Sequence, residues 1–304
     1  MVTGIPGLDD DAQQCTERTP RVVAARKLLR RAGRERAGRF LVEGAQAVSA
    51  ALVAAADPTR SVTVTELFLT DTAATRHPEV IRRAGELGAR ISPITDRAVA
   101  TLSETVTPQG LVAVVGLVDV PLSEALAATP RLVVVLVDAS DPGNAGTVIR
   151  VADAAGADAV VLAGDCVDPH NGKCVRASVG SLFHLPLARE TDTRVALDAC
   201  RAAGLRLLAT AAAGEHDLHD PVTERELLAE PCAWLLGSEA HGLPEPVLAA
   251  ADATVRVPIY GQAESLNLAS AASICVYATT RMQREARISP EPGSDGGRSA
   301  ARVT

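Results

Sequence analysis

The stretch RLVVVLVDASDPGNAGTVIR, residues 131–150, predicts the fold of the C-terminal half of the chain. Its uninterrupted aliphatic run, Leu132 to Val137, is typical of a parallel β-strand that is covered on both faces. A Pro-Gly turn follows, and we expect the next helix to begin near Asn144 and to occupy residues 145–155. A strand that leads directly into a helix is the unit of a doubly wound α/β sheet, whose ligands bind beyond the carboxyl ends of the strands.

The same alternation continues to the end of the chain. Three further strands are expected, at DAVVLAG (158–164), LRLLAT (205–210) and CAWLLG (232–237). Helices are expected around 174–181 and, as a long closing helix, over 266–286. Residues 131–288 therefore predict an α/β domain in which helices cover both faces of a parallel sheet.

A smaller α/β domain is expected over residues 21–118. Its elements are a basic amphipathic helix, a strand ending at FLVEG, a helix at 45–56, a strand at ELFLT, a helix near 79–87 and a strand at 110–116. A linker at 119–130, with Pro121 and Pro130 near its edges, joins the two domains. We expect residues 1–20 to be a disordered arm and residues 289–304 to be a flexible tail.

Composition limits the class of protein. The first residues are acidic and lack an apolar stretch, so they are not a secretory signal, and no aliphatic run approaches the ~20 residues of a membrane span. We therefore expect a cytoplasmic protein without a membrane partner. The six cysteines are scattered without a Cys-x-x-Cys pair, which favours reduced, mostly buried thiols and no metal site.

The net charge of −7 argues against a nucleic-acid partner, but the distribution of charge favours one. A basic cluster precedes the first strand, opposed only by Glu35: Arg18, Arg21, Arg26, Lys27, Arg30, Arg31, Arg34, Arg36 and Arg39. Such a cluster is the usual footprint of phosphate binding, and Arg26, Lys27 and Arg30 are our candidates for contact with a nucleic acid. The alternative is a solvated helix face.

Three polar segments follow strands or precede the last helix. They are DASDPGNAGTVIR (138–150), LLGSEAHGL (235–243) and VPIYGQAESLNLASA (257–271), in which Ser265 is placed to cap the long helix. Each segment alone is equally compatible with an ordinary strand-to-helix turn or a capped helix. Their occurrence together and in this order is the informative observation.

Together the three segments resemble the motifs of the SpoU (TrmH) family of RNA 2'-O-methyltransferases. NAGTVIR matches the first motif, N-x-G-x-x-x-R, and the other two segments match the second and third. The resemblance is dense over residues 131–285. Residues 40–116 are more loosely similar to the substrate-binding domain of rRNA-modifying members, which favours 23S rRNA over tRNA as the substrate.

The resemblance implies a fold, a cofactor and a partner. The fold is a parallel sheet with a deep trefoil knot, formed here by residues 235–268, which wraps S-adenosylmethionine. Members are typically homodimers, and the long final helix is expected to help form the contact. The residues expected to bind the cofactor are Leu236, Gly237, Val257, Ile259 and Leu266.

The resemblance also implies roles for polar residues. Arg150 matches the catalytic arginine and is also expected to contact RNA, while Arg176 is expected to bind RNA phosphate. The polar partners in the motifs are Asn144, Glu239, Ser265 and Asn267. Arg150 acts either as a general base or as a phosphate clamp, and the clamp is favoured because a guanidinium normally remains charged.

Three other functions are less consistent with the sequence. A tRNA ribose methyltransferase would ordinarily lack the extra N-terminal domain. A catalytically silent RNA-binding protein on the same fold would not need Asn144, Arg150, Glu239 and Asn267. A nicotinamide-dependent enzyme would carry G-x-G-x-x-G after a strand, and none is present.

Overall fold

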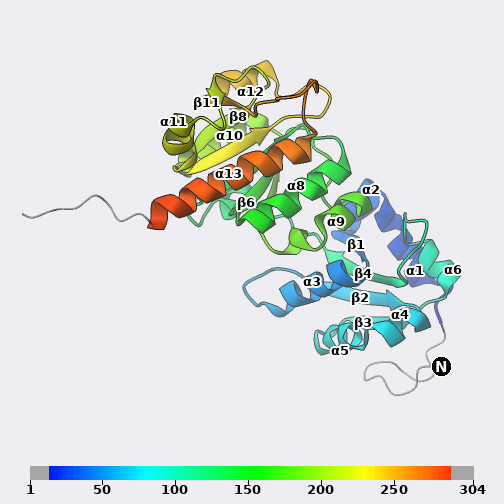
Figure 1. The fold of residues 1–304 in the computed structure, drawn as a ribbon. Coiled ribbons are helices and arrows are strands. Elements are labelled where there is room, and N and C mark those ends of the chain that lie inside the picture. Colours follow the sequence, from blue (N-terminus) through cyan, green and yellow to red (C-terminus); the bar gives the residue numbers. More distant parts are fainter. Residues whose placement is uncertain (1–13, 289–304) are drawn as a thin grey trace, which may run out of the picture.

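The computed structural model describes residues 14–288, which form two β-sheets joined by residues 117–131 (Figure 1). In the C-terminal sheet the strands are ordered β7-β6-β5-β10-β8-β11-β9, and every neighbouring pair is parallel. The strands are β5 (Leu132–Val137), β6 (Ala159–Ala163), β7 (Leu187–Glu190), β8 (Arg206–Thr210), β9 (His216–Asp217), β10 (Cys232–Leu236) and β11 (Ala253–Arg256). The predicted parallel sheet is therefore confirmed.

Helices cover both faces of this sheet, as the aliphatic run predicted. Leu132, Val134 and Leu136 of β5 are buried on one face. Val133, Val135 and Val137 are buried on the other. The first face packs against α8 (Pro142–Ala155), α9 (Gly172–Ser178) and α13 (Leu268–Ile288), and the second against α7 (Leu122–Ala125), α10 (Thr193–Ala202) and α12 (Glu245–Ala250). In Figure 1, α8 and α13 run side by side across the sheet.

The remaining short helices of this half are η2 (Ser181–Phe183), α11 (Pro221–Thr223) and η3 (Glu224–Leu228). Strand β10, which precedes the second motif, lies in the sheet between β5 and β8. The deep trefoil knot that the resemblance implies fits this fold.

The N-terminal sheet is mixed, with the order β1-β4-β2-β3. Strand β4 (Leu111–Gly116) runs antiparallel to both β1 (Arg39–Glu43) and β2 (Val64–Leu69), and β3 (Arg90–Pro93) is parallel to β2. The helices of this half are α1 (Pro20–Arg26), η1 (Lys27–Leu29), α2 (Arg31–Ala37), α3 (Ala45–Ala56), α4 (Asp71–Arg76), α5 (Pro78–Glu86) and α6 (Asp96–Ala100).

The structure corrects several expected boundaries. The disordered arm expected at 1–20 is wrong from Cys15 onward, because Cys15 is buried and pairs with Ile94 beside β3. Residues 1–13 and the tail expected at 289–304 lie outside the described residues. The expected linker carries α7, which packs against the C-terminal sheet. Strands β3, β7, β9 and β11 are short and were not predicted.

Candidate active site at the carboxyl ends of the parallel strands

Helix α8 begins earlier than the sequence suggested. It starts at Pro142 rather than near Asn144, because Asp141 is its N-cap and accepts a hydrogen bond from the Asn144 N–H at 2.8 Å. Lys173 of α9 donates to the other oxygen of Asp141 at 2.6 Å, and this bond lowers the pKa of Asp141. With the cap supplied by Asp141, the side chain of Asn144 is free for a different role.

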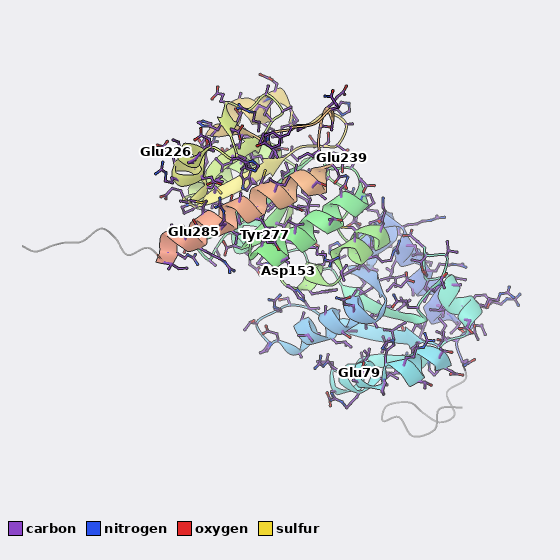
Figure 2. All side chains as sticks on the ribbon, in the orientation of Figure 1. Glu79, Asp153, Glu226, Glu239, Tyr277 and Glu285 are labelled. Carbon is purple, nitrogen blue, oxygen red and sulfur yellow. The ribbon has the colours of Figure 1, made fainter. Side chains whose placement is uncertain are left out.

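Asn144 joins the three motif segments through its side-chain amide. Its Nδ2 donates to Glu239 Oε1 at 2.9 Å. Its Oδ1 accepts from Asn267 Nδ2 at 3.0 Å. Figure 2 shows Glu239 close to the N-terminal end of α13, where Asn267 lies. We call these residues the Glu239–Asn144–Asn267 chain, and it brings together three of the five predicted catalytic residues.

Glu239 is held ionised in this chain. Partial burial opposes the charge of the carboxylate, but hydrogen bonds from Asn144 Nδ2 and from nearby backbone N–H groups, including that of Ser140, outweigh it and lower the pKa of Glu239. The carboxylate therefore acts as a fixed acceptor near neutral pH. It orients Asn144, which in turn orients Asn267.

Asn267, rather than Ser265, caps the long final helix. Its Oδ1 accepts from the N–H of Ala269 at 2.9 Å, and α13 begins at Leu268. Ser265 lies two residues too early to reach those N–H groups. Asn267 therefore serves the helix with its oxygen and the site with its nitrogen.

Gly237 directly follows β10, at the start of a tight loop. Ser238 and Gly242 exchange two backbone hydrogen bonds of 3.1 and 2.9 Å, which close the loop that carries Glu239. A Cβ at Gly237 would lie 2.1 Å from the carbonyl carbon of Gly242, so only glycine fits. The requirement for glycine here is steric, and it fixes the position of the Glu239 loop.

A cavity lies between the carboxyl ends of β8 and β11 and the third motif. It is lined by Thr210, Ala211, Ala212, Val255, Val257, Ile259, Glu264, Ser265, Leu266 and Ala271. Three of the five predicted cofactor residues, Val257, Ile259 and Leu266, are in its wall. Leu236 is fully buried in β10 and does not line it.

Sequence reasoning missed the contribution of β8 to this cavity. Thr210, Ala211 and Ala212 follow LRLLAT and belong to none of the three motifs. The available signal was positional, since these residues stand at the carboxyl end of a predicted parallel strand, where ligands bind in such sheets.

Arg150 stands apart from the Glu239–Asn144–Asn267 chain. It lies six residues after Asn144, so at about 100° per residue the two side chains point about 120° apart around α8. Arg150 is exposed, and no hydrogen bond or ion pair within residues 14–288 engages its guanidinium.

The basic candidates divide into two groups. Arg26, Lys27 and Arg30 are exposed and line one depression of the surface together with Arg36. Arg176 instead forms ion pairs with Glu43 at 3.6 Å and Glu104 at 3.9 Å, both in the N-terminal half. Its guanidinium is thus engaged between the two halves of the molecule.

Trp234 and five of the six cysteines lie in the core. Trp234 is fully buried and donates to Thr279 Oγ1 at 2.9 Å, as expected for a core residue. All six thiols are free; burial raises the pKa of Cys166 and of Cys200 to about 11. Among residues 14–288 there is no group of side chains suited to a metal ion. In the same range, no helix combines the length and the apolarity that crossing a membrane requires.

Comparison with known proteins places this site in a family. The model of the SpoU rRNA methylase family matches residues 131–277, and that of the MRM3-like substrate-binding domain matches residues 19–113. The 23S rRNA (guanosine(2553)-2'-O)-methyltransferase RlmP of Bacillus subtilis is 36% identical over 253 residues, covering 83% of this chain and 92% of that protein.

Two solved structures with bound cofactor are similar over most of their length. The AdoMet-bound rRNA methyltransferase from Sinorhizobium meliloti has a TM-score of 0.76 at 30% identity, covering 89% of this chain and 98% of that one. The SpoU methyltransferase AviRb from Streptomyces viridochromogenes, in complex with AdoMet, has a TM-score of 0.74 at 30% identity, covering 88% and 99%.

The fold and the three joined motifs thus define an α/β methyltransferase with an added N-terminal domain. The chain belongs to the SpoU rRNA methylase family.

Proposed function

We propose that this protein transfers a methyl group from S-adenosylmethionine to a ribose 2'-hydroxyl of 23S rRNA. The observation that carries the proposal is the Glu239–Asn144–Asn267 chain, which holds all three motif segments together next to the cavity at the ends of β8 and β11. The similarity to the Bacillus subtilis 23S rRNA methyltransferase and to the two AdoMet-bound structures supports the same activity.

The residues of the cavity fit the cofactor. Its wall combines apolar side chains, Val257, Ile259 and Leu266, with polar groups of Thr210, Glu264 and Ser265, as expected for an adenosine-sized ligand. Gly237, the other predicted cofactor residue, follows the neighbouring strand β10 and is covered by the Gly242 backbone, so it does not line this cavity. When bound, S-adenosylmethionine would supply an electrophilic methyl group on a sulfonium.

The protein must then align and activate the 2'-oxygen of the RNA substrate. A ribose 2'-hydroxyl is a poor nucleophile until its proton leaves or its developing charge is stabilised. Arg150 is exposed and unpaired within the described residues, so its guanidinium is free to hold the adjacent phosphate and stabilise the developing alkoxide. We favour this role over that of a general base, because a guanidinium normally remains charged.

The test is methyl transfer from labelled S-adenosylmethionine to unmodified 23S rRNA and tRNA transcripts. We expect alkali-resistant label on 23S rRNA, and a roughly hundredfold or greater loss with Arg150→Ala. Arg194→Ala, an exposed arginine of α10 away from the cavity, is the matched control and should keep native activity. Label on tRNA alone would contradict the assignment of 23S rRNA as the substrate. Absence of S-adenosylmethionine binding would contradict the proposal that the protein is a methyltransferase.

We propose that Arg26, Lys27 and Arg30 form the RNA-docking surface. These residues, together with Arg36, place four positive charges around one depression of the N-terminal half, and no carboxylate within residues 14–288 pairs with them. The match of residues 19–113 to a substrate-binding domain supports this assignment. Arg176 contributes to RNA binding only if its pairs with Glu43 and Glu104 open.

We propose further that the protein is a homodimer that associates through α13. Ile274 and Tyr277 lie on this helix and are 36% and 51% exposed, which is unusual for large apolar side chains on a helix that covers a sheet (Figure 2). We expect light scattering to give the mass of a dimer for the native chain and of a monomer for Tyr277→Glu. A native monomer would contradict the proposal.

A further inference from the structure

A buried ion-pair network joins the N-terminal half to the segment between β6 and α9. Arg34 of α2 is 3% exposed, and its Nε and Nη2 donate to Asp168 Oδ2 at 2.8 and 2.7 Å. Arg34 Nη1 also donates to the carbonyls of Leu28 and Leu29, at 3.0 Å each. Arg34 therefore connects η1 to the C-terminal half. The segment that η1 belongs to also carries Arg26, Lys27 and Arg30.

The network continues through His170 into the linker. The Val118 N–H donates to His170 Nε2 at 3.2 Å, so that nitrogen is the acceptor and Nδ1 bears the proton. His170 Nδ1 then donates to Asp168 Oδ1 at 3.2 Å. Arg189 of β7 closes the network by pairing with Asp119 at 3.0 Å. Two arginines and two aspartates are present, so the formal charges cancel.

Asp168 is the centre of the network. Burial by itself opposes the charge of this carboxylate, yet the bonds from His170 and Arg34 outweigh burial and hold the pKa of Asp168 well below its usual range. The carboxylate is ionised and buried, so if one partner were removed its charge would have to be solvated by water. The two halves of the molecule would have to separate locally to admit that water.

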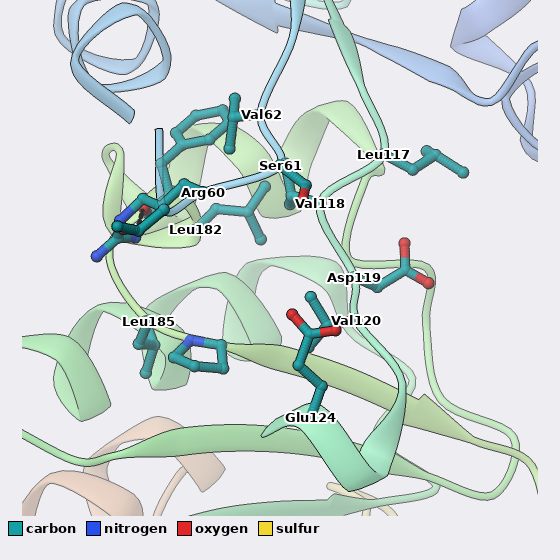
Figure 3. Close-up of a pocket in the computed structure, with 13 residues that line it drawn as sticks. Arg60, Ser61, Val62, Leu117, Val118, Asp119, Val120, Glu124, Leu182 and Leu185 are labelled. Atoms are coloured by element: carbon teal, nitrogen blue, oxygen red, sulfur yellow. Dashed lines mark hydrogen bonds between the residues drawn. The ribbon is translucent and has the colours of Figure 1, made fainter. Parts of the chain in front are cut away.

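Apolar packing fills only part of the interface next to this network, where Phe40 of β1 packs on His170 with ring centroids 4.7 Å apart. A cavity of about 300 Å³ lies between the two halves. Its wall is formed by residues 60–62 of the N-terminal half, by the linker residues Leu117–Val120, and by Leu182 and Leu185 of the C-terminal half (Figure 3). Asp119 belongs both to the wall of this cavity and to the network. Arg60, which donates to the carbonyls of Phe183 and His184, and Arg176 also make polar contacts between the halves, but both are partly exposed. The bonds of Arg34 to Asp168 are the buried directional contacts, and they fix an orientation.

The same segment leads directly into the candidate active site. Helix α9 begins at Gly172, immediately after the Asp168–His170 segment, and α8 packs closely against it. A Cβ at Gly146 of α8 would lie 2.3 Å from the Cys174 carbonyl oxygen, so the two helices cannot shift independently. Lys173 and Asp141 join their N-terminal ends. The network is thus connected through two rigid helices to Asn144.

We propose that Arg34 and Asp168 are positioning residues, which hold the RNA-docking surface at a fixed orientation to the methyl-transfer site. The inference rests on the proposed function for the identity of the substrate. RNA that is docked on Arg26, Lys27 and Arg30 reaches the cofactor cavity with its ribose in line only when this orientation is fixed. Loss of the network should therefore lower kcat while the separate binding steps persist.

The first measurement is a distance between the two halves. Spin labels at Glu79→Cys on α5 and Val195→Cys on α10, both exposed helix positions, give a distance distribution by pulsed electron paramagnetic resonance. Excess unlabelled protein limits each assembly to one labelled protomer. We expect a narrow distribution for the native network and for Arg82→Met, which removes an exposed arginine paired with Glu86, and a broader one for Arg34→Met.

The second measurement separates positioning from binding. We expect Arg34→Met to lower kcat at least tenfold, with the Kd of S-adenosylmethionine within twofold and that of RNA within threefold of native. Arg34→Lys keeps the positive charge but not the planar guanidinium, so its kcat should lie between those of the native protein and Arg34→Met. The triple variant Arg26→Ala, Lys27→Ala, Arg30→Ala should instead raise the Kd of RNA.

Two outcomes would overturn the proposal. One is a native distance distribution with kcat within twofold for Arg34→Met. The other is a parallel fall of kcat and of the affinities for S-adenosylmethionine and RNA, which would make the role of Arg34 merely structural. Absence of methyl transfer by the native chain would overturn the proposed function instead, while the distance measurement would still test the network.

Discussion

Gly237 shows how a single residue shapes the site. The second motif places it at the end of a buried strand, where its role from sequence alone is to expose backbone groups. The structure gives a steric reason as well, because the Gly242 backbone occupies the space that a Cβ would need. The loop that carries Glu239 can close over β10 only with glycine at this position.

A methyl group at this position should therefore disturb the Glu239 loop. We expect Gly237→Ala to destabilise the protein by about 1–3 kcal/mol through overpacking and to weaken the binding of S-adenosylmethionine. Chemical denaturation and calorimetric titration measure the two effects. Gly261→Ala, where a Cβ meets open space, controls for the loss of glycine and should retain native stability. Native cofactor affinity in Gly237→Ala would contradict the steric argument.

At the scale of the element, α13 depends on a residue with two functions. Asn267 caps the helix through Oδ1 and holds Asn144 through Nδ2. The sequence placed this cap at Ser265, because serine is a frequent N-cap residue and precedes the apolar pattern. The choice between the two residues depended on the path of the chain before the helix.

Two substitutions should separate the functions of Asn267. We expect Asn267→Ala to cost about 1 kcal/mol of stability through the lost cap and also to reduce kcat. Asn267→Asp keeps an oxygen for the cap but loses the N–H that Asn144 accepts, so it should retain stability and still lose activity. Thermal unfolding and single-turnover methyl transfer give the two quantities. Equal activity of Asn267→Asp and the native chain would exclude a role for the Asn267–Asn144 bond.

At the scale of the whole molecule, the Arg34–Asp168 pair joins parts of the chain that are 134 residues apart in sequence. Its stability contribution has a defined pH dependence. The folded state lowers the pKa of Asp168, so the contribution is complete above the unfolded pKa of about 3.9 and is lost as the pH falls toward the folded pKa.

Asp168→Asn should therefore destabilise the protein by roughly 3–5 kcal/mol at neutral pH, because it leaves the buried Arg34 without its counter-charge. We expect the gap in unfolding free energy between native and variant to stay constant from pH 8 to pH 5 and to shrink below about pH 4. Denaturant titrations across this range measure it. A gap that already shrinks between pH 7 and pH 5 would show that Asp168 is not held ionised.

The sequence predicted the fold where burial is locally encoded. The run at 132–137 is aliphatic at every position because both faces of β5 are covered, and the helix at 45–56 was predicted with its observed bounds. Strands β3, β7, β9 and β11 were missed because each is only two to four residues long. So few residues give no periodic pattern, and their pairing partners are distant in the chain.

The sequence by itself determined the class of fold, the three motifs and their family, because strand burial and motif order are local properties. Only the tertiary structure decided which side chains meet. It joined Asn144 to Glu239 and Asn267, separated Arg150 from them, and engaged Arg34 and Arg176 between the two halves. Arg30 and Arg34 are the same residue type in the same basic cluster, and they differ only in the residues that surround them in the folded protein. That difference arises from contacts between residues far apart in sequence, which no local pattern records.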